Sequence, residues 1–397
     1  MFARGRRSLC LTLLILAALW LPACGPTSGG PIKLYVSLPL QTRQGESIRK
    51  GIELAVNQAG GRVANFEIVL VARTDSLESG QWDADREQAN AYEAVADPEV
   101  MAYIGPADSG AAFVSIPITN REGLAQISPS NTAPELTRAG FYPGRPGEFY
   151  PTGRRNYFRT CPTDAAQGPA AAIWARELGY RSVYVLDDGD VYGVSIANLF
   201  EEKALDVQIA VAGRASIDKT ATDFGEVLNR VEQADPDLVF FGGTTENGAP
   251  LVVKQMREQG LRAHFMVPDG AADSTFIERA VGAAEGVLGT QIGEPPQALT
   301  TEVGAQFYQA YRVAYDEEPE PYAQFGYDAA RVVLDAIRRA GVKDRRAILE
   351  AIANIRDFPG TGGAFRFDRN GDTTLTTISG NQVKDGKFVF LQPLIQH

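Results

Sequence analysis

Short apolar runs alternate with amphipathic segments along most of this chain. The runs at 32–38, 66–72, 100–105 and 123–128 have the length and composition of buried strands. Between them lie helix-like segments at 47–61, 83–97 and 109–121; in the first, Ile48, Ile52 and Val56 are spaced four apart, as on one face of a helix. This alternation predicts parallel βαβ units and an open α/β sheet.

The alternation is interrupted once and then resumes. Residues 138–157 are rich in Gly, Pro, Arg and aromatic side chains and predict a long irregular segment. Further strands are expected at 157–160, 182–187, 207–213, 237–243, 264–268 and 286–292, with helices between them, followed by helices at 300–315, 324–340 and 344–354. The tail predicts short antiparallel strands with turns at 368–372 and 384–386. The pattern therefore indicates two successive α/β lobes, onto which the last helices and strands pack back.

Composition and charge narrow the possible functions. A chain of 397 residues can bury two separate cores, and its formal charge of −11 argues against nucleic-acid binding. Two histidines, His264 and His397, and three cysteines cannot build a Cys/His metal site of ordinary spacing. The sequence contains no G-x-S-x-G, Walker or H-E-x-x-H motif, and only His264 could serve as an internal base. We therefore expect a binding protein without cofactor or metal rather than an enzyme.

The first 23 residues predict a signal peptide. Three arginines precede an apolar stretch at 9–21, which is short for a membrane span. The following "LPAC" resembles a lipobox, which would place a lipid anchor on Cys24 and leave 24–31 as a tether. An ordinary signal peptide or an uncleaved anchor is the alternative. We expect an extracytoplasmic, lipid-anchored protein. With residues 1–23 removed and Cys24 lipidated, Cys161 is the only thiol left in the mature chain, so no internal disulfide can form.

Polar segments follow six of the predicted strands. They are 105–110, 128–136, 161–169, 187–193, 242–248 and 268–273. Ligands of open α/β sheets bind beyond the carboxyl ends of the strands, so these segments are the candidates for a site. In "ISPSNTAPEL" (127–136), short hydrogen-bonding side chains separate a strand from a helix-like segment. This is either turn chemistry with Thr132 as an N-cap, or an anion site at a helix N-terminus.

These six segments, in this order, resemble the branched-chain amino-acid binding proteins of ABC transporters, which have the type I periplasmic-binding fold. The similarity spans about 32–395 and is most specific at 127–137, 158–172 and 285–290. It implies two Rossmann-like open-sheet lobes joined by a three-crossover hinge. It also implies a chain path, with the first lobe formed by 32–157 and 294–356 and the second by 158–293 and 357–397.

The resemblance further implies roles for individual residues. Those expected to bind a ligand carboxylate are Ser109, Ser130, Asn131 and Thr132. Those expected to bind an ammonium are Asp164 and Asp269. Those expected to cover the ligand or line its pocket are Tyr192, Thr244, Thr245 and Gln41. Each also has a structural interpretation, because Ser109 and Asp164 could cap helices, Asp269 could sit in a turn and Tyr192 in the core.

Two acidic segments resemble metal-binding loops in composition. Asp187, Asp188 and Asp190 occur in one loop without other hard ligands, which predicts a solvated loop. In "DRNGD" (368–372) the glycine comes too early for a calcium loop and no bidentate Glu follows, which predicts a hairpin turn.

The function predicted from these features is capture of an amino acid or amino-acid-like solute between two closing lobes, and its delivery to an ABC importer. Its partners would be a permease and ATPase complex, and a membrane reached through Cys24; the protein is expected to be monomeric. The alternative is a ligand-sensing receptor subunit for an amide, urea or amino acid. Asn131, Thr244 and Thr245 are more polar than a leucine pocket requires, which argues against a wholly apolar ligand side chain.

Overall fold

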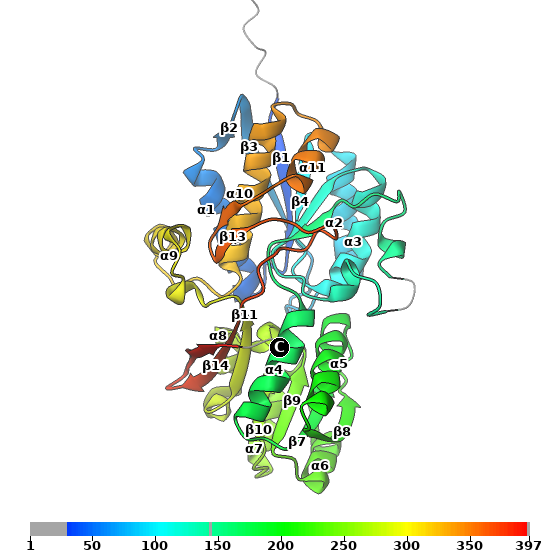
Figure 1. Ribbon diagram of the computed structural model, residues 1–397, viewed down its shortest axis with the longest axis vertical. Helices are drawn as coiled ribbons and strands as arrows, with labels where there is room; N and C mark the ends of the chain where they lie inside the picture. The colour runs from blue at the N-terminus through cyan, green and yellow to red at the C-terminus, as the bar shows by residue number, and fades with distance from the viewer. Residues whose placement is uncertain (1–29, 143–144, 395–397) are drawn as a thin grey trace, which may run out of the picture.

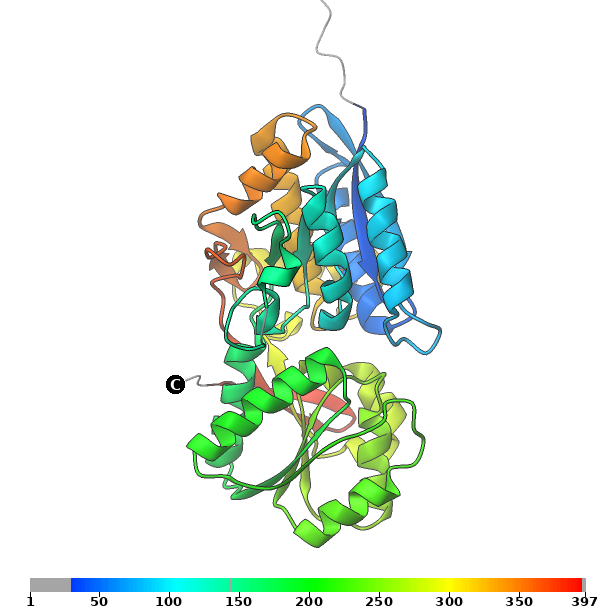
Figure 2. The ribbon, with the colours of Figure 1, turned by 90° about the vertical axis from the view of Figure 1, so that its right-hand side faces the viewer.

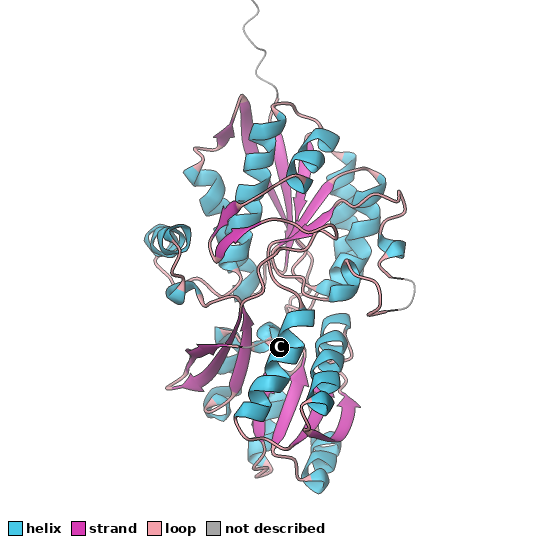
Figure 3. Cartoon of the chain, in the orientation of Figure 1, coloured by secondary structure: helices cyan, strands magenta, loops and turns pink. Residues whose placement is uncertain are grey.

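The computed structural model describes residues 30–142 and 145–394, which form two α/β lobes stacked along the long axis (Figure 1). In both lobes a sheet lies between helices (Figure 3). The first sheet has the order β2-β3-β1-β4-β5-β6. Its strands are β1 (Ile32–Leu38), β2 (Arg62–Val63), β3 (Phe66–Thr74), β4 (Val100–Ile104), β5 (Ala125–Ser128) and β6 (Tyr157–Arg159). All pair in parallel except the two-residue β2, as the strand–helix alternation predicted.

Helices from distant parts of the sequence cover the first sheet. They are α1 (Arg43–Gln58), α2 (Ala84–Ala96), α3 (Ser109–Arg121), α10 (Ala323–Ala340) and α11 (Arg345–Ala353). A further helix, α9 (Glu302–Tyr315), packs against α1 and α10. Helices α2 and α3 lie on one face, while α1, α10 and α11 pack together on the other (Figure 2). Helix α10 lies so close to α1 that a Cβ atom added at Gly51 would be only 2.2 Å from the carbonyl oxygen of Ala323. The close approach of these backbones explains a glycine inside each helix, at Gly51 and Gly326.

The second sheet has the order β15-β14-β11-β10-β9-β7-β8. Its strands are β7 (Ser182–Asp187), β8 (Ala210–Ser216), β9 (Leu238–Gly242), β10 (His264–Val267), β11 (Leu288–Ile292), β14 (Ile378–Lys384) and β15 (Lys387–Pro393). Its helices are α4 (Asp164–Glu177), α5 (Val191–Asp206), α6 (Gly225–Ala234), α7 (Ala249–Glu258) and α8 (Ser274–Ala280). The predicted antiparallel tail is confirmed, because β14 pairs antiparallel with both β11 and β15.

Both faces of the second sheet are buried, which explains why its central strands are continuously apolar. On β9, Phe240 stacks on Phe200 of α5, with ring centroids 3.9 Å apart. The next residue, Phe241, faces the opposite core beside Phe265. A strand covered by helices on both faces needs apolar side chains at successive positions, as in parallel sheets generally.

The chain passes between the lobes three times, after β6, after β11 and after the hairpin of β12 (Phe358–Gly360) and β13 (Gly363–Phe365). The predicted three-crossover arrangement is confirmed. Strand membership departs from the predicted lobe bounds in two places. Residues 158 and 159 pair with β5 in the first sheet. The second is at 357–372, which was predicted for the second lobe: the β12–β13 hairpin packs against α9, and Asp372 pairs with Arg159 of β6 at 2.7 Å.

The segment between β5 and β6 contains no α-helix among its described residues. After Thr132, where a helix was expected, there is a single 3-10 turn, η1 (Pro134–Leu136), followed later by η2 (Gly147–Phe149). The Arg159 guanidinium binds the carbonyl oxygens of Asn131 and Ala133 at 3.0 and 2.9 Å, so both carbonyls are committed to a side chain. The predicted signal peptide and Cys24 lie outside the described residues. Among those described, no helix has the length and apolarity to span a bilayer.

A candidate binding cleft between the lobes

A cleft lies where the carboxyl ends of the strands of the two sheets face each other. It encloses about 660 Å³, including the part open to solvent. Five of the residues selected from the sequence line it: Ser109, Ser130, Tyr192, Thr244 and Asp269. They come from both lobes, as a site that closes around a ligand requires. The rule that ligands bind beyond the strand ends therefore located the cleft correctly.

The first-lobe side of the cleft combines the start of α3 with the loop after β5. Asp108 is the N-cap of α3 and accepts a hydrogen bond of 2.7 Å from Gly110 N, so Ser109 is not the cap. The hydroxyl of Ser109 accepts a bond of 3.3 Å from the backbone N–H of Ala133. Ser130 donates its hydroxyl to the Ala107 carbonyl at 3.0 Å. These bonds hold two chain segments side by side and place two hydroxyl oxygens at the cleft.

The two residues after Ser130 are buried and differ in their pairing. The side chain of Asn131 donates to the Ala107 carbonyl at 2.9 Å and accepts from the Tyr157 hydroxyl at 2.9 Å. It is therefore already paired within the first lobe. The hydroxyl of Thr132 is buried and has no hydrogen-bond partner. Because buried polar groups are rarely left unpaired, Thr132 is the better candidate for a ligand contact.

A fully buried arginine fixes the shape of this loop. Arg159, on β6, pairs with Asp372 and donates a further bond of 2.5 Å to the hydroxyl of Thr137. Together with its bonds to two loop carbonyls, this bond means that the guanidinium donates to three residues of segment 131–137 and holds that segment in place. Sequence reasoning missed this residue, although a charged side chain within an apolar strand was a visible signal.

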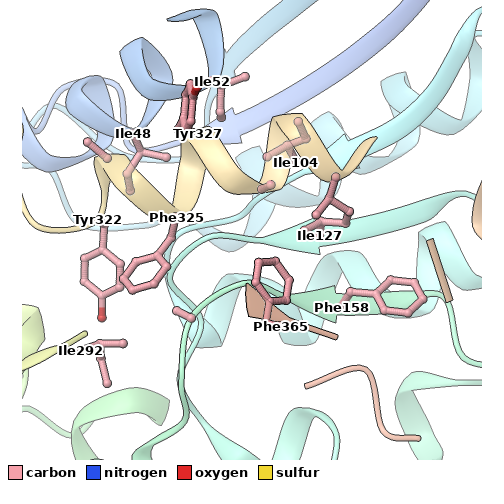
Figure 4. Close-up of a cluster of buried hydrophobic side chains, with 14 of the residues drawn as sticks. Ile48, Ile52, Ile104, Ile127, Phe158, Ile292, Tyr322, Phe325, Tyr327 and Phe365 are labelled. Carbon is pink, nitrogen blue, oxygen red and sulfur yellow. The ribbon is translucent and has the colours of Figure 1, made fainter. Parts of the chain in front are cut away.

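Asp269 lies on the second-lobe side and is held by two tyrosines. The Tyr192 hydroxyl donates to one carboxylate oxygen at 2.6 Å and accepts from Gly270 N at 3.1 Å. Tyr322, at the start of α10, donates to the other oxygen. Figure 4 shows Tyr322 projecting from its helix toward the second-lobe residue Ile292. Burial raises the pKa of Asp269, and the hydroxyl groups of Tyr192 and Tyr322 partly offset that rise.

Asp164 is completely buried at the start of α4 and is unpaired. Neither carboxylate oxygen has a hydrogen-bond partner, and its side chain does not cap the helix. Burial, and then the nearby Asp269 carboxylate, raise its pKa well above the usual range. The Thr132 hydroxyl approaches closely enough to offset part of this rise, but the two groups form no hydrogen bond of good geometry. Asp164 is not among the residues that line the cleft.

Two of the predicted pocket residues have other contacts. Thr245 is buried and donates its hydroxyl to Asp273 at 3.1 Å. Gln41 is exposed and accepts hydrogen bonds from Thr74 and Ser76, which orders the loop after β3. Neither lines the cleft.

The acidic loop at 187–190 is not solvated, contrary to the prediction. Asp187 pairs with Arg214 at 2.7 Å, and Asp188 accepts a bond of 2.8 Å from Asn247. Asp190 pairs with Lys219 at 2.6 Å. All three side chains are buried, and their bonds hold the loop against its neighbours. Among the described residues, no group of acidic, histidine and cysteine side chains could hold a metal ion.

Direct contacts join the two lobes across the cleft. From the first lobe, Trp82 Nε1 donates to Asp190 at 2.9 Å, and Gln81 donates to the Asn247 side chain at 3.1 Å. The Trp82 ring lies against α3, where a side chain at Gly110 would meet it at 2.5 Å. The sequence analysis did not select Trp82, although an aromatic residue in a polar loop beyond a strand end was the available signal. The structure thus has its lobes in contact, with Trp82 forming part of the cleft wall.

The comparisons with known proteins agree with this geometry. The profile described as periplasmic binding protein matches residues 39–387. A Brucella abortus protein named Leu/Ile/Val-binding protein homolog 2 is 28% identical, with 94% of this chain and 96% of that protein covered. A Pseudomonas aeruginosa leucine-, isoleucine-, valine-, threonine- and alanine-binding protein is 28% identical over 88% of this chain and 85% of its own. The crystal structure of a leucine-binding protein from Thermotoga maritima has a TM-score of 0.81 and 29% identity, covering 91% of this chain and 98% of its own.

Proposed function

The chain belongs to the periplasmic binding protein family, and on that premise we propose that it captures an amino acid or amino-acid-like solute and delivers it to an ABC importer. Membership of this family implies an extracytoplasmic location, and its members are binding proteins. The relatives named for leucine, isoleucine and valine support an amino acid as the ligand. The observation that carries the proposal is a cleft with hydroxyl donors on one lobe and a buried carboxylate on the other.

In this proposal the ligand carboxylate binds the first lobe. Ser109 and Ser130 line the cleft, and Thr132 follows two residues after Ser130 with an unpaired hydroxyl. The Ser130 hydroxyl already donates to a carbonyl, so the donors open to a ligand are the hydroxyls of Ser109 and Thr132. Asn131 would act by holding this loop in place, since its side chain is paired within the lobe and its backbone N–H donates to the Ser128 hydroxyl at 2.9 Å. Hydroxyl and backbone N–H donors suit a carboxylate and avoid the cost of desolvating a buried cation beside it.

The ligand ammonium would bind Asp269. A carboxylate has about four lone-pair sites, so Asp269 can accept an ammonium while keeping both tyrosine hydroxyls. Asp164 is buried and unpaired, and a ligand ammonium at Asp269 would favour its ionised form. The ligand would lower the cost of keeping these carboxylates ionised, which gives the occupied, closed cleft a free energy that neither lobe provides alone.

Two further parts of the proposal concern the cell rather than the cleft. A lipid on Cys24 would hold the protein at a membrane through the tether at 24–31. The protein would act as a monomer, with a permease and ATPase complex as its partner.

The proposal is tested by thermal unfolding of the purified protein with a panel of small solutes. A ligand that binds only the folded state raises the midpoint by mass action. We expect a rise with α-amino acids, and none with the matching carboxylic acids that lack an amino group or with urea. A rise with the acids or with urea alone would contradict the proposal, because Asp269 would then have no ammonium to bind.

A further inference from the structure

The cleft contains more carboxyl groups than one α-ammonium group requires. Four carboxylates line it: Asp75, Asp108, Glu246 and Asp269. Its described lining residues include no lysine, arginine or histidine. Glu246 has Arg279 at 4.0 Å, outside the lining, whereas an α-amino acid with a neutral side chain would bring no further cation for Asp75 and Asp108.

Asp75 is the unexplained member of this set. It follows β3 directly and is fully buried, and neither of its carboxylate oxygens has a hydrogen-bond partner. Its backbone is firmly held, because its N–H donates to the Leu38 carbonyl at 3.2 Å and its carbonyl accepts from Asp83 N at 2.8 Å. A buried carboxylate without a hydrogen-bond partner is costly, and because Asp75 lies in the cleft wall, a ligand bound in the cleft could supply the missing partner.

The neighbours of Asp75 are acidic and already engaged. Glu87 accepts bonds from the hydroxyls of Ser37 and Tyr103, at 2.6 and 2.8 Å. Asp108 caps α3. Burial, followed by the charges of Glu87 and Asp108, raises the pKa of Asp75 well above its usual range. This corner of the first lobe therefore carries three carboxyl groups close together.

The nearby cations have other partners. Lys219 pairs with Asp190, and Arg86 donates to the Ser76 carbonyl at 2.6 Å. The described residues offer no group suited to a metal ion. An organic cation is therefore the partner that fits. Trp82 stands beside this corner in the cleft wall, and aromatic faces attract such cations; the Lys219 ammonium already lies 5.9 Å from its ring centroid.

We propose that Asp75 and Asp108 form a second cation subsite, and that the ligand is an α-amino acid with an ammonium or guanidinium group in its side chain. The inference rests on the proposed function, in which Asp269 takes the α-ammonium and the hydroxyl donors take the carboxylate. It adds the class of side chain. A basic side chain would reach the first-lobe wall at Asp75, and its charge would compensate the acidic corner.

Calorimetric titration of the purified protein with paired amino acids tests the inference. The pairs are ornithine with norvaline, lysine with norleucine, and arginine with citrulline; each is similar in length and differs in charge. We expect the basic member of at least one pair to bind about tenfold more tightly or better. If the neutral members bind equally well or better, the inference fails while the proposed function stands. If none of the six binds, the inference fails, and the thermal-unfolding panel decides the proposed function separately.

A variant locates the effect. Asp75→Asn keeps the shape of the side chain and removes its charge, so it should abolish most of the preference for the basic member of the pair. Asp83→Asn is the matched control, because Asp83 lies in the same loop, outside the cleft lining, and asparagine can also cap α2. A preference that survives Asp75→Asn, or that Asp83→Asn removes equally, would overturn the assignment. The comparison of ligand pairs needs no variant and decides the question even if Asp75→Asn does not fold.

Discussion

Trp82 Nε1 of the first lobe donates a hydrogen bond of 2.9 Å to Asp190 Oδ2 of the second lobe. The same carboxylate oxygen binds the Lys219 ammonium at 2.6 Å. Lys219 and Asp190 belong to one lobe, so their pairing persists when the lobes separate. The bond from Trp82 exists only while the lobes are in contact, and it therefore stabilises the closed state specifically.

Trp82→Phe should therefore weaken ligand binding mainly by speeding dissociation. Hydrogen bonds to charged groups contribute about 1.5–3 kcal/mol, so we expect a loss of about tenfold or somewhat more in affinity for whichever amino acid binds the wild type. Surface plasmon resonance would measure the dissociation rate directly. Trp174→Phe is the control, since Trp174 is buried in α4 outside the cleft lining and should affect thermal stability instead. An unchanged dissociation rate for Trp82→Phe would mean that this bond does not hold the cleft closed.

The two-lobe fold was predictable because its signals are local. Continuous apolar runs such as β9 report burial on both faces, and the polar segments after the strands report the edge at which a ligand binds. The same rule placed Ser109, Ser130 and Asp269 at the cleft. The spacing of apolar residues did not indicate which lobe each segment of the last third of the chain joins. That assignment came from the family resemblance.

The missed residues depend on packing between distant segments. Trp82 and Asp75 lie in a polar loop after β3, and nothing in that loop indicates which side chains turn inward. Tyr322 begins α10, more than fifty residues after Asp269, and the two meet only because the chain returns to the first lobe. Asn131 shows the converse, since a polar side chain in the right segment is used to hold the loop together.

When the solution is acidified, Tyr322→Phe should begin to lose ligand affinity at a higher pH than the wild type does. Binding of an ammonium requires an ionised Asp269, and the Tyr322 hydroxyl lowers the pKa of that buried carboxyl. Without the hydroxyl the pKa rises further, so affinity for an α-amino acid should begin to fall at a higher pH as the solution is acidified. Titrations between about pH 5 and about pH 9 would measure the displacement. Tyr327→Phe, on the same helix but bonded to Gln58, should leave the profile unchanged; equal profiles for the wild type and Tyr322→Phe would contradict the prediction.

Asp164→Asn should stabilise the ligand-free protein, and more so at alkaline pH. An aspartate in the unfolded chain titrates near about pH 3.9, whereas burial and Asp269 raise the pKa of folded Asp164 well above this. Between these values the native state holds a proton that the unfolded state has lost, so stability falls as the pH rises. The variant lacks this loss. Chemical unfolding at about pH 5 and about pH 8 should show its advantage growing with pH.

Asp237→Asn provides a control of opposite sign. Hydrogen bonds from the backbone of Arg181 and Ser182 lower the pKa of Asp237, so its carboxylate stabilises the fold above the unfolded pKa. This variant should lose stability at about pH 8. If Asp164→Asn behaved in the same way, the buried carboxyl would have a partner that offsets its burial.

Cys24→Ser should release the protein from membranes. The lipid anchor predicted from "LPAC" is attached only to a cysteine at that position, so serine removes the anchor without changing the binding lobes. Fractionation of cells expressing either form would show the wild type with membranes and the variant in the soluble extracytoplasmic fraction, both binding ligand equally. A variant that still sediments with membranes would argue for an uncleaved N-terminal anchor.

Thr132→Val should discriminate between an amino acid and its amide. The unpaired Thr132 hydroxyl is proposed to donate to the ligand carboxylate, and a bond to a charged acceptor is worth more than one to a neutral amide oxygen. Calorimetry with an amino acid that binds and with its amide should therefore show a larger loss for the acid. Thr244→Val makes the same change on the second-lobe wall and should weaken both ligands equally. If Thr132→Val also weakened both equally, the carboxylate would have to bind elsewhere, and the hydroxyl-lined side of the cleft would instead face a neutral part of the ligand.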